Sequence, residues 1–316
     1  MTGCLFNGYW RWIHFLNKAH TKIKTVSFKL HGNKSTSPKF TTMRKPMVVS
    51  IAFSVLQLTG CNKFEELQET KLDTRKQQTL WEIKYGSHTR NTLDIALPAN
   101  RTDSTPVVIF IHGGAWVFGD KSVHIPEIEK FAQAGIACAT INYRYASDIT
   151  GVHHPALPND VRAAVDFIAG KAQLWGISAN RFGLVGQSAG GHLALITSYT
   201  LNNDYRIKAC ASWAGVVNLL DSAQDAVTGA ALIGKTYMGC DLKTAADTLR
   251  YKEASPYYMV SSTSVPTFLL QGTNDIAVPY SSVVKMQQRL AELEVDNRMT
   301  VFNGGGHLWF GSDLEN

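Results

Sequence analysis

The chain has few cysteines, and none has the spacing by which cysteines usually act together. Among its five cysteines, no two form the C-x-x-C motif that zinc and redox sites commonly use. Cys138 and Cys210 lie within apolar runs, where a small buried thiol is common. The peptide at 119–124, Gly-Asp-Lys-Ser-Val-His, lacks the spacing of a phosphate-binding loop. We therefore expect no disulfide framework, no metal site and no cofactor.

Acidic residues are missing from the first 60 positions, which hold nine Lys or Arg. Removing those nine from the 31 Lys and Arg leaves 22, against 25 Asp and Glu in residues 61–316. The net charge of +6 therefore comes from the N-terminal region, and the body is mildly acidic. A basic balance of this origin gives no reason to expect nucleic-acid binding.

The N-terminal region also has no apolar run of the roughly 20 residues that a membrane-spanning helix needs. Its apolar stretch at 47–58 is shorter, follows the basic residues Arg44 and Lys45, and leads into Leu-Thr-Gly-Cys at 58–61. This order resembles a bacterial lipoprotein signal peptide over residues 43–60. A buried apolar segment with an incidental cysteine is the alternative interpretation.

The resemblance implies that Cys61 is acylated and anchors the protein to the membrane of a bacterial cell envelope. Asn62 stands where an aspartate would retain a lipoprotein at the inner membrane, which favours the outer membrane in a cell that has two. Residues 1–42 would then precede a translation start at Met43, and a disordered basic arm is the other possibility. Without an anchor, the protein would be cytoplasmic.

Beyond a polar tether at 61–80, strand-like and helix-like segments alternate through residues 81–316. Repeated strand–helix–strand order predicts an α/β fold with a mostly parallel central sheet, helices on both faces and an antiparallel hairpin at one edge. Residues 216–255 are too long for an ordinary connection, so we expect a small cap or lid there. Strands are expected at 81–86, 91–98, 107–114, 137–144, 181–187, 208–215, 266–273 and 298–305, and helices near 122–134, 159–175, 189–200 and 280–293.

A serine stands between two glycines where a predicted strand turns into a predicted helix. Residues 186–190 have the sequence Gly-Gln-Ser-Ala-Gly, which matches G-x-S-x-G in a strand–turn–helix context. Glycines at both ends allow the strand and the helix to approach closely, so the sharp turn holds the hydroxyl of Ser188 out of the core. This position suits a nucleophile. The structural alternative is a helix N-cap serine.

A serine nucleophile needs a base, and the base needs a carboxylate. His307 follows the last predicted strand on a glycine-rich loop, whereas His192 lies on the helix behind Ser188 and is not expected to reach the hydroxyl. Asp275 directly follows a buried strand, at the sheet edge where the serine also lies. Asp296 is the second choice for the acid, but it precedes its strand and so lies at the opposite edge.

Backbone donors for an oxyanion are expected from two places. Gly113 and Gly114 follow a buried strand with their N–H groups uncovered, and Ala189 follows the serine. We expect His112 to fix this loop by hydrogen bonds and not to act as the base. Trp116 is expected to line the substrate pocket, with ordinary packing as the alternative.

The four motifs HGGAW, GQSAGG, GTNDIAVP and GGGH, in this order over residues 80–310, resemble α/β-hydrolase esterases of the hormone-sensitive-lipase and feruloyl-esterase-like groups. The first motif also resembles arylformamidases. The order Ser188, Asp275, His307 is that of the α/β-hydrolase triad. The resemblance implies an α/β-hydrolase that cleaves small or glycan-linked carboxylic esters through an acyl-enzyme. An arylformamidase-like amide hydrolase and a catalytically inactive binding protein on the same fold are the alternatives.

Overall fold

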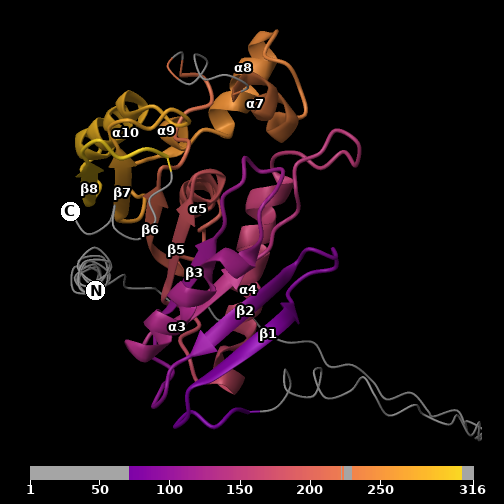
Figure 1. Cartoon of the computed structure of the whole chain (residues 1–316), viewed down its shortest axis with the longest axis vertical. Helices are drawn as coiled ribbons and strands as arrows, with labels where there is room; N and C mark the ends of the chain where they lie inside the picture. Colours follow the sequence, from indigo (N-terminus) through magenta and orange to yellow (C-terminus); the bar gives the residue numbers. More distant parts are fainter. Residues whose placement is uncertain (1–70, 222, 224–229, 308–316) are drawn as a thin grey trace, which may run out of the picture.

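The computed structural model describes residues 71–221, 223 and 230–307. The expected signal peptide at 43–60, the acylation site Cys61 and the segment 1–42 lie outside these residues. Within the described part, eight strands form one sheet in the order β1-β2-β4-β3-β5-β6-β7-β8 (Figure 1). The strands are β1 (Gln78–Lys84), β2 (Thr92–Leu97), β3 (Val107–Ile111), β4 (Ala137–Ile141), β5 (Phe182–Gln187), β6 (Ile207–Trp213), β7 (Thr267–Gly272) and β8 (Asn297–Phe302).

The sheet is antiparallel at one edge and parallel elsewhere. β2 pairs antiparallel with β1 and with β4, whereas all pairs from β4 through β8 are parallel. The loops that follow β3, β5 and β7 therefore leave the sheet at the same edge. This edge is where the sequence places the candidate site residues.

Helices cover both faces of the sheet because the central strands are apolar on both sides. All five residues of β3 are buried. Phe110 belongs to the core with residues of α3, whereas Ile109 and Ile111 belong to the core with residues of α4 and α5. The helices of the described ranges are η1 (Lys121–His124), α3 (Ile125–Gln133), α4 (Ala156–Trp175), α5 (Ala189–Thr200), α7 (Ala230–Met238), α8 (Ala245–Glu253), α9 (Pro256–Met259) and α10 (Tyr280–Glu292).

Several expected boundaries move. β1 begins at Gln78, so the last residues of the expected tether at 61–80 belong to the sheet. α4 begins at Ala156, three residues before the expected start at 159. The expected cap, 216–255, contains α7 and α8, which lie at the top of Figure 1 above α5. Among the described residues, none of the helices has both the length and the apolar content to cross a membrane.

The turn from β5 into α5 is possible only because two glycines pass close to other backbone atoms. A Cβ atom on Gly186 would lie 2.1 Å from the carbonyl oxygen of Gly190. One on Gly190 would lie 2.0 Å from the carbonyl oxygen of Ile111, in β3. Side chains do not fit at either position, so the helix can begin directly against the sheet.

We predict that Gly190→Ala lowers the free energy of unfolding by about 1–3 kcal/mol or more, because backbone atoms must move apart. Gly170→Ala is the matched control. Gly170 lies in α4, and a Cβ atom there would have no atom within 4 Å beyond the adjoining helix backbone. There alanine should stabilise the helix by about 1 kcal/mol. Denaturant unfolding of both variants measures the difference, and equal effects would contradict the close approach.

Candidate active site

Ser188 lies at the corner between β5 and α5 in a strained backbone conformation. Its φ is 53° and its ψ is −122°, a region that side chains disfavour. Its N–H donates to the carbonyl oxygen of Trp213 at 2.7 Å. Ser188 occupies the N-cap position of α5, but its hydroxyl makes no capping hydrogen bond. The hydroxyl instead lies 2.9 Å from Nε2 of His307, so the arrangement differs from that of an N-cap serine.

Three distant segments bring their side chains into one hydrogen-bonded relay. The other ring nitrogen of His307, Nδ1, lies 2.9 Å from Oδ2 and 3.1 Å from Oδ1 of Asp275. An ionised carboxylate only accepts, so Nδ1 carries the proton and Nε2 is left to accept one from the Ser188 hydroxyl. The structure thus brings together the serine, histidine and aspartate that the sequence singles out, in the protonation arrangement that a general base needs.

Asp275 is buried and is held in place from several sides. Its Oδ1 accepts hydrogen bonds from the backbone N–H groups of Ala277 and Val278, both at 2.8 Å. Its Oδ2 accepts from the side-chain amide of Gln271 at 2.9 Å. Burial raises the pKa of Asp275, but the hydrogen bonds from His307, Val278 and Ala277 outweigh burial and place the pKa below its ordinary value. Asp275 is therefore ionised at neutral pH.

Gln271 has no role in the sequence-based prediction, although the sequence contains a signal for it. It is a wholly buried polar residue near the end of β7, in an otherwise apolar run. Its amide also donates to the carbonyl oxygen of Val278 at 2.8 Å. Gln271 therefore joins the strand to the turn that presents Asp275. Asp296 lies at the other edge, where its carbonyl oxygen accepts from the N–H of Thr267 at the start of β7.

The loop after β3 passes directly beside the serine. A Cβ atom on Gly113 would lie 3.3 Å from Cβ of Ser188. Within the described residues, the N–H groups of Gly113, Gly114 and Ala189 have no hydrogen-bond acceptor. Ala189 is the first residue of α5, where the helix dipole favours negative charge. These three amides are available to an anionic oxygen formed next to the serine.

His192 and Trp116 lie behind the site and join it to the cap. Nε1 of Trp116 donates to Nδ1 of His192 at 3.3 Å, and Nε2 of the same imidazole lies 2.8 Å from the carbonyl oxygen of Ala254. Trp116 also stacks on Tyr237 of α7, with ring centroids 4.5 Å apart. His192 is fully buried and bonded through both nitrogens, so it is not placed to act on Ser188. The contacts of Trp116 are those of core packing, and its role in the substrate pocket stays a prediction.

The sheet order, the helices on both faces and the strand–turn–helix at the serine define an α/β-hydrolase fold. The chain belongs to the BD-FAE family, whose model matches residues 93–290. Two solved structures share the fold. A truncated carbohydrate esterase from gut microbiota has a TM-score of 0.63 at 21% identity and covers 76% of this chain and 92% of its own. Thermogutta terrifontis esterase 2, phosphonylated by sarin, has a TM-score of 0.62 at 19% identity, covering 77% and 91%.

Two curated proteins are similar in sequence. The "Probable carboxylic ester hydrolase LipM" of Mycobacterium tuberculosis is 31% identical over 213 residues, which are 63% of this chain and 48% of that protein. The "Probable isoprenylcysteine alpha-carbonyl methylesterase ICMEL1" of Oryza sativa is 35% identical over 116 residues, or 36% of this chain and 26% of that protein. The chain thus spans about half or less of the length of these relatives.

We predict that the free energy of unfolding falls in mild acid, because several histidines are buried. Burial lowers the pKa of His192 to about 3, well below its ordinary value near 6.5. Between about pH 6.5 and pH 3, this imidazole is therefore protonated in the unfolded chain but not in the folded chain. The free energy of unfolding consequently falls as the pH falls through this range. His112 and His154, whose pKa values burial lowers to about 4, act in the same direction.

We expect His192→Gln to be less stable than the wild type at pH 7, because it loses the contacts with Trp116 and Ala254. The free energy of unfolding of the variant should then fall less steeply between about pH 6.5 and pH 4. The difference in slope should correspond to about one fewer proton taken up on unfolding. Denaturant unfolding across this pH range gives both slopes. Parallel curves for variant and wild type would show that His192 does not carry the pH dependence.

Proposed function

We propose that this protein is a serine carboxylic-ester hydrolase that works through an acyl-enzyme. The observation that carries the proposal is the Ser188–His307–Asp275 relay, beside backbone amides that have no acceptor among the described residues. The names of relatives support it, since LipM is described as a carboxylic ester hydrolase. The substrates that we propose are small or glycan-linked esters, and no nucleic acid partner or cofactor is part of the proposal.

The geometry supplies each step of ester hydrolysis. Ser188 Oγ attacks the ester carbonyl carbon while its proton passes to Nε2 of His307. The carbonyl oxygen becomes an oxyanion that the amides of the two glycines and of Ala189 stabilise. His307 then gives the proton to the departing alcohol, and the acyl group remains on the serine. Water repeats the sequence with His307 as base, which releases the acid and restores the serine. Asp275 remains ionised and stabilises the imidazolium.

We predict that a fluorophosphonate probe labels the wild type at Ser188 and that Ser188→Ala abolishes labelling. Hydrolysis of short-chain aryl esters should fall by at least about 10³-fold in the same variant. Ser122→Ala is the control, because Ser122 lies exposed in η1 and should keep both properties. Peptide mass spectrometry after digestion locates the adduct. A folded wild type that takes no label would instead support an inactive binding protein.

A hydrolysis panel separates the ester and amide alternatives. It compares aryl acetates and butyrates, acetylated and feruloylated sugars, and N-formylkynurenine with the same purified wild type. Turnover of the esters at kcat/KM values well above that of the formamide supports the proposal. A preference for N-formylkynurenine would assign the relay to amide cleavage.

We further propose that Cys61 carries a lipid anchor that holds the enzyme at the bacterial cell envelope, at the outer membrane where there is one. The support is the sequence order at 43–61 alone. In a bacterial host, the wild type should partition into Triton X-114 and incorporate an alkyne-tagged fatty acid, whereas Cys61→Ser should do neither. Cys240→Ser is the control, because Cys240 is a half-buried thiol near the cap helices and should leave lipidation unchanged. An unlabelled wild type in the cytoplasm would contradict the anchor.

A further inference from the structure

The loop that would hold the oxyanion is built from unfavourable backbone conformations. Ala115 and Trp116 have φ values of 48° and 63°, and Gly114 and Gly119 have φ values of 114° and 104°. The two residues other than glycine are strained in this region. Such a loop keeps its shape only where the surrounding contacts determine it.

One arginine contacts both ends of this loop from a distant turn. Arg90 lies in the turn between β1 and β2, on the antiparallel side of the sheet. Its Nη2 lies 3.3 Å from Nε2 of His112, just before the loop, and donates to the carbonyl oxygen of Gly119, at the end of the loop, at 3.2 Å. The same guanidinium donates to the side chain of Asn142 at 3.0 Å and to the carbonyl oxygen of Tyr143 at 2.9 Å.

Aromatic rings complete the same assembly. The Arg90 guanidinium lies over the ring of Tyr145, 3.7 Å from its centroid, and the Tyr145 hydroxyl donates to the Gly119 carbonyl oxygen. His112 stacks on Tyr143 with centroids 4.3 Å apart. Arg90 therefore connects the end of β3, the end of the loop and the segment after β4.

The partners of His112 determine its protonation. Arginine can only donate, so Nε2 of His112 can only accept at this contact, where Nη2 of Arg90 shares its two hydrogens among His112, Gly119 and Asn142. The carbonyl oxygen of Gly113 can only accept, so Nδ1, at 2.7 Å, must carry the hydrogen and donate to it. His112 is therefore neutral. Burial chiefly, together with the charge of Arg90, lowers the pKa of this imidazole to about 4.

The hydrogen bond from His112 sets the direction of an oxyanion donor. The carbonyl of Gly113 and the N–H of Gly114 belong to the same planar peptide group. Fixing the direction of the Gly113 oxygen therefore fixes the direction of the Gly114 N–H. Orientation matters because an oxyanion-hole donor acts through its alignment with the charge that develops in the transition state.

We propose that Arg90 is a positioning residue for the oxyanion hole, which acts through His112 on the Gly113–Gly114 peptide. This inference rests on the proposed ester hydrolysis. Arg90 lies three residues before the stretch 93–290 that the family model matches, in the turn that leads into β2. Arg90 itself touches no reacting group.

Steady-state kinetics of Arg90→Gln and Arg90→Lys test the proposal. We expect kcat to fall about 10- to 100-fold in Arg90→Gln with KM within about twofold, because the lost alignment matters only when the oxyanion forms. The inhibition constant of a trifluoromethyl ketone, which forms an oxyanion on the serine, should rise in proportion to the loss in kcat/KM. Arg90→Lys keeps the charge but not the fork of donors, so its kcat should lie in between.

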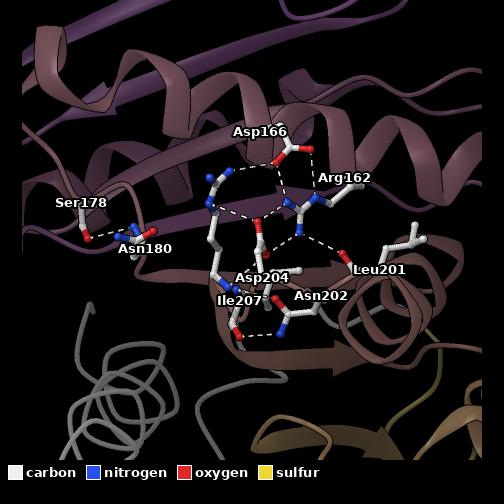
Figure 2. A network of polar contacts seen from close by, with 9 residues as sticks. Arg162, Asp166, Ser178, Asn180, Leu201, Asn202, Asp204 and Ile207 are labelled. Atoms are coloured by element: carbon white, nitrogen blue, oxygen red, sulfur yellow. Dashed lines mark hydrogen bonds and ion pairs between the residues drawn. The ribbon is translucent and has the colours of Figure 1, made fainter. Parts of the chain in front are cut away.

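Arg162 provides the matched control. Its guanidinium, from α4, is held by Asp166, Asp204 and the carbonyl oxygen of Leu201, as Figure 2 shows. Leu201 directly follows α5, about 20 Å along the helix axis from Ser188. Arg162→Gln should therefore lose stability without a change in kcat. An equal fall in kcat in both variants, or a rise in KM alone for Arg90→Gln, would overturn the proposal.

Two further results keep the test decisive. If Arg90→Gln does not fold, ¹⁵N NMR of wild-type His112 still applies, and a ring protonated at Nε2 in place of Nδ1 would overturn the inference. A wild type that neither binds the fluorophosphonate at Ser188 nor cleaves esters would refute the proposed function. A labelled, active wild type whose folded Arg90→Gln variant keeps full kcat would refute only the role of Arg90.

Discussion

The close passage of the backbone where β5 becomes α5 is the constraint on which the site depends. Gly186 and Gly190 allow helix and sheet to meet without side chains between them, and the Gly190 position lies against the end of β3. The corner leaves Ser188 in a strained conformation and places the start of α5 beside the loop that follows β3. Ser188 and the amides that we propose as oxyanion donors are thus neighbours because of one backbone contact.

Three histidines near the corner between β5 and α5 are held in defined protonation states, because each has partners that can only donate or only accept a hydrogen bond. Asp275 makes His307 donate through Nδ1, which leaves Nε2 facing the serine. His112 is placed between a guanidinium and a carbonyl oxygen, and His192 between an indole N–H and a carbonyl oxygen. The first ring is positioned to exchange a proton. The other two rings are buried and neutral. His112 holds the loop that follows β3, and His192 holds Trp116 and the backbone at Ala254.

The sequence predicts those features that arise locally or from the order of elements. G-x-S-x-G between a buried strand and a helix predicts the corner, and the rule that parallel strands share a carboxyl edge brings Asp275 and His307 to it. Arg90 could not be found in this way, because it stands in a polar hairpin turn and the hydrogen-bond partners of its guanidinium lie 22 to 53 positions further along the chain. Strand and helix ends also moved by a few residues, since burial and pairing decide them more than the local pattern does.

The stack of Trp116 on Tyr237 connects the cap to the sheet edge that carries Ser188. Trp116 belongs to the loop that follows β3, whereas Tyr237 belongs to α7 and its hydroxyl lies 2.9 Å from Nδ1 of His154. His192 adds a second tie, from Trp116 to the carbonyl oxygen of Ala254. A rearrangement of α7 large enough to separate the two rings would therefore also disturb the loop. The cap helix α7 and the loop that holds Gly113 and Gly114 are therefore mechanically one unit.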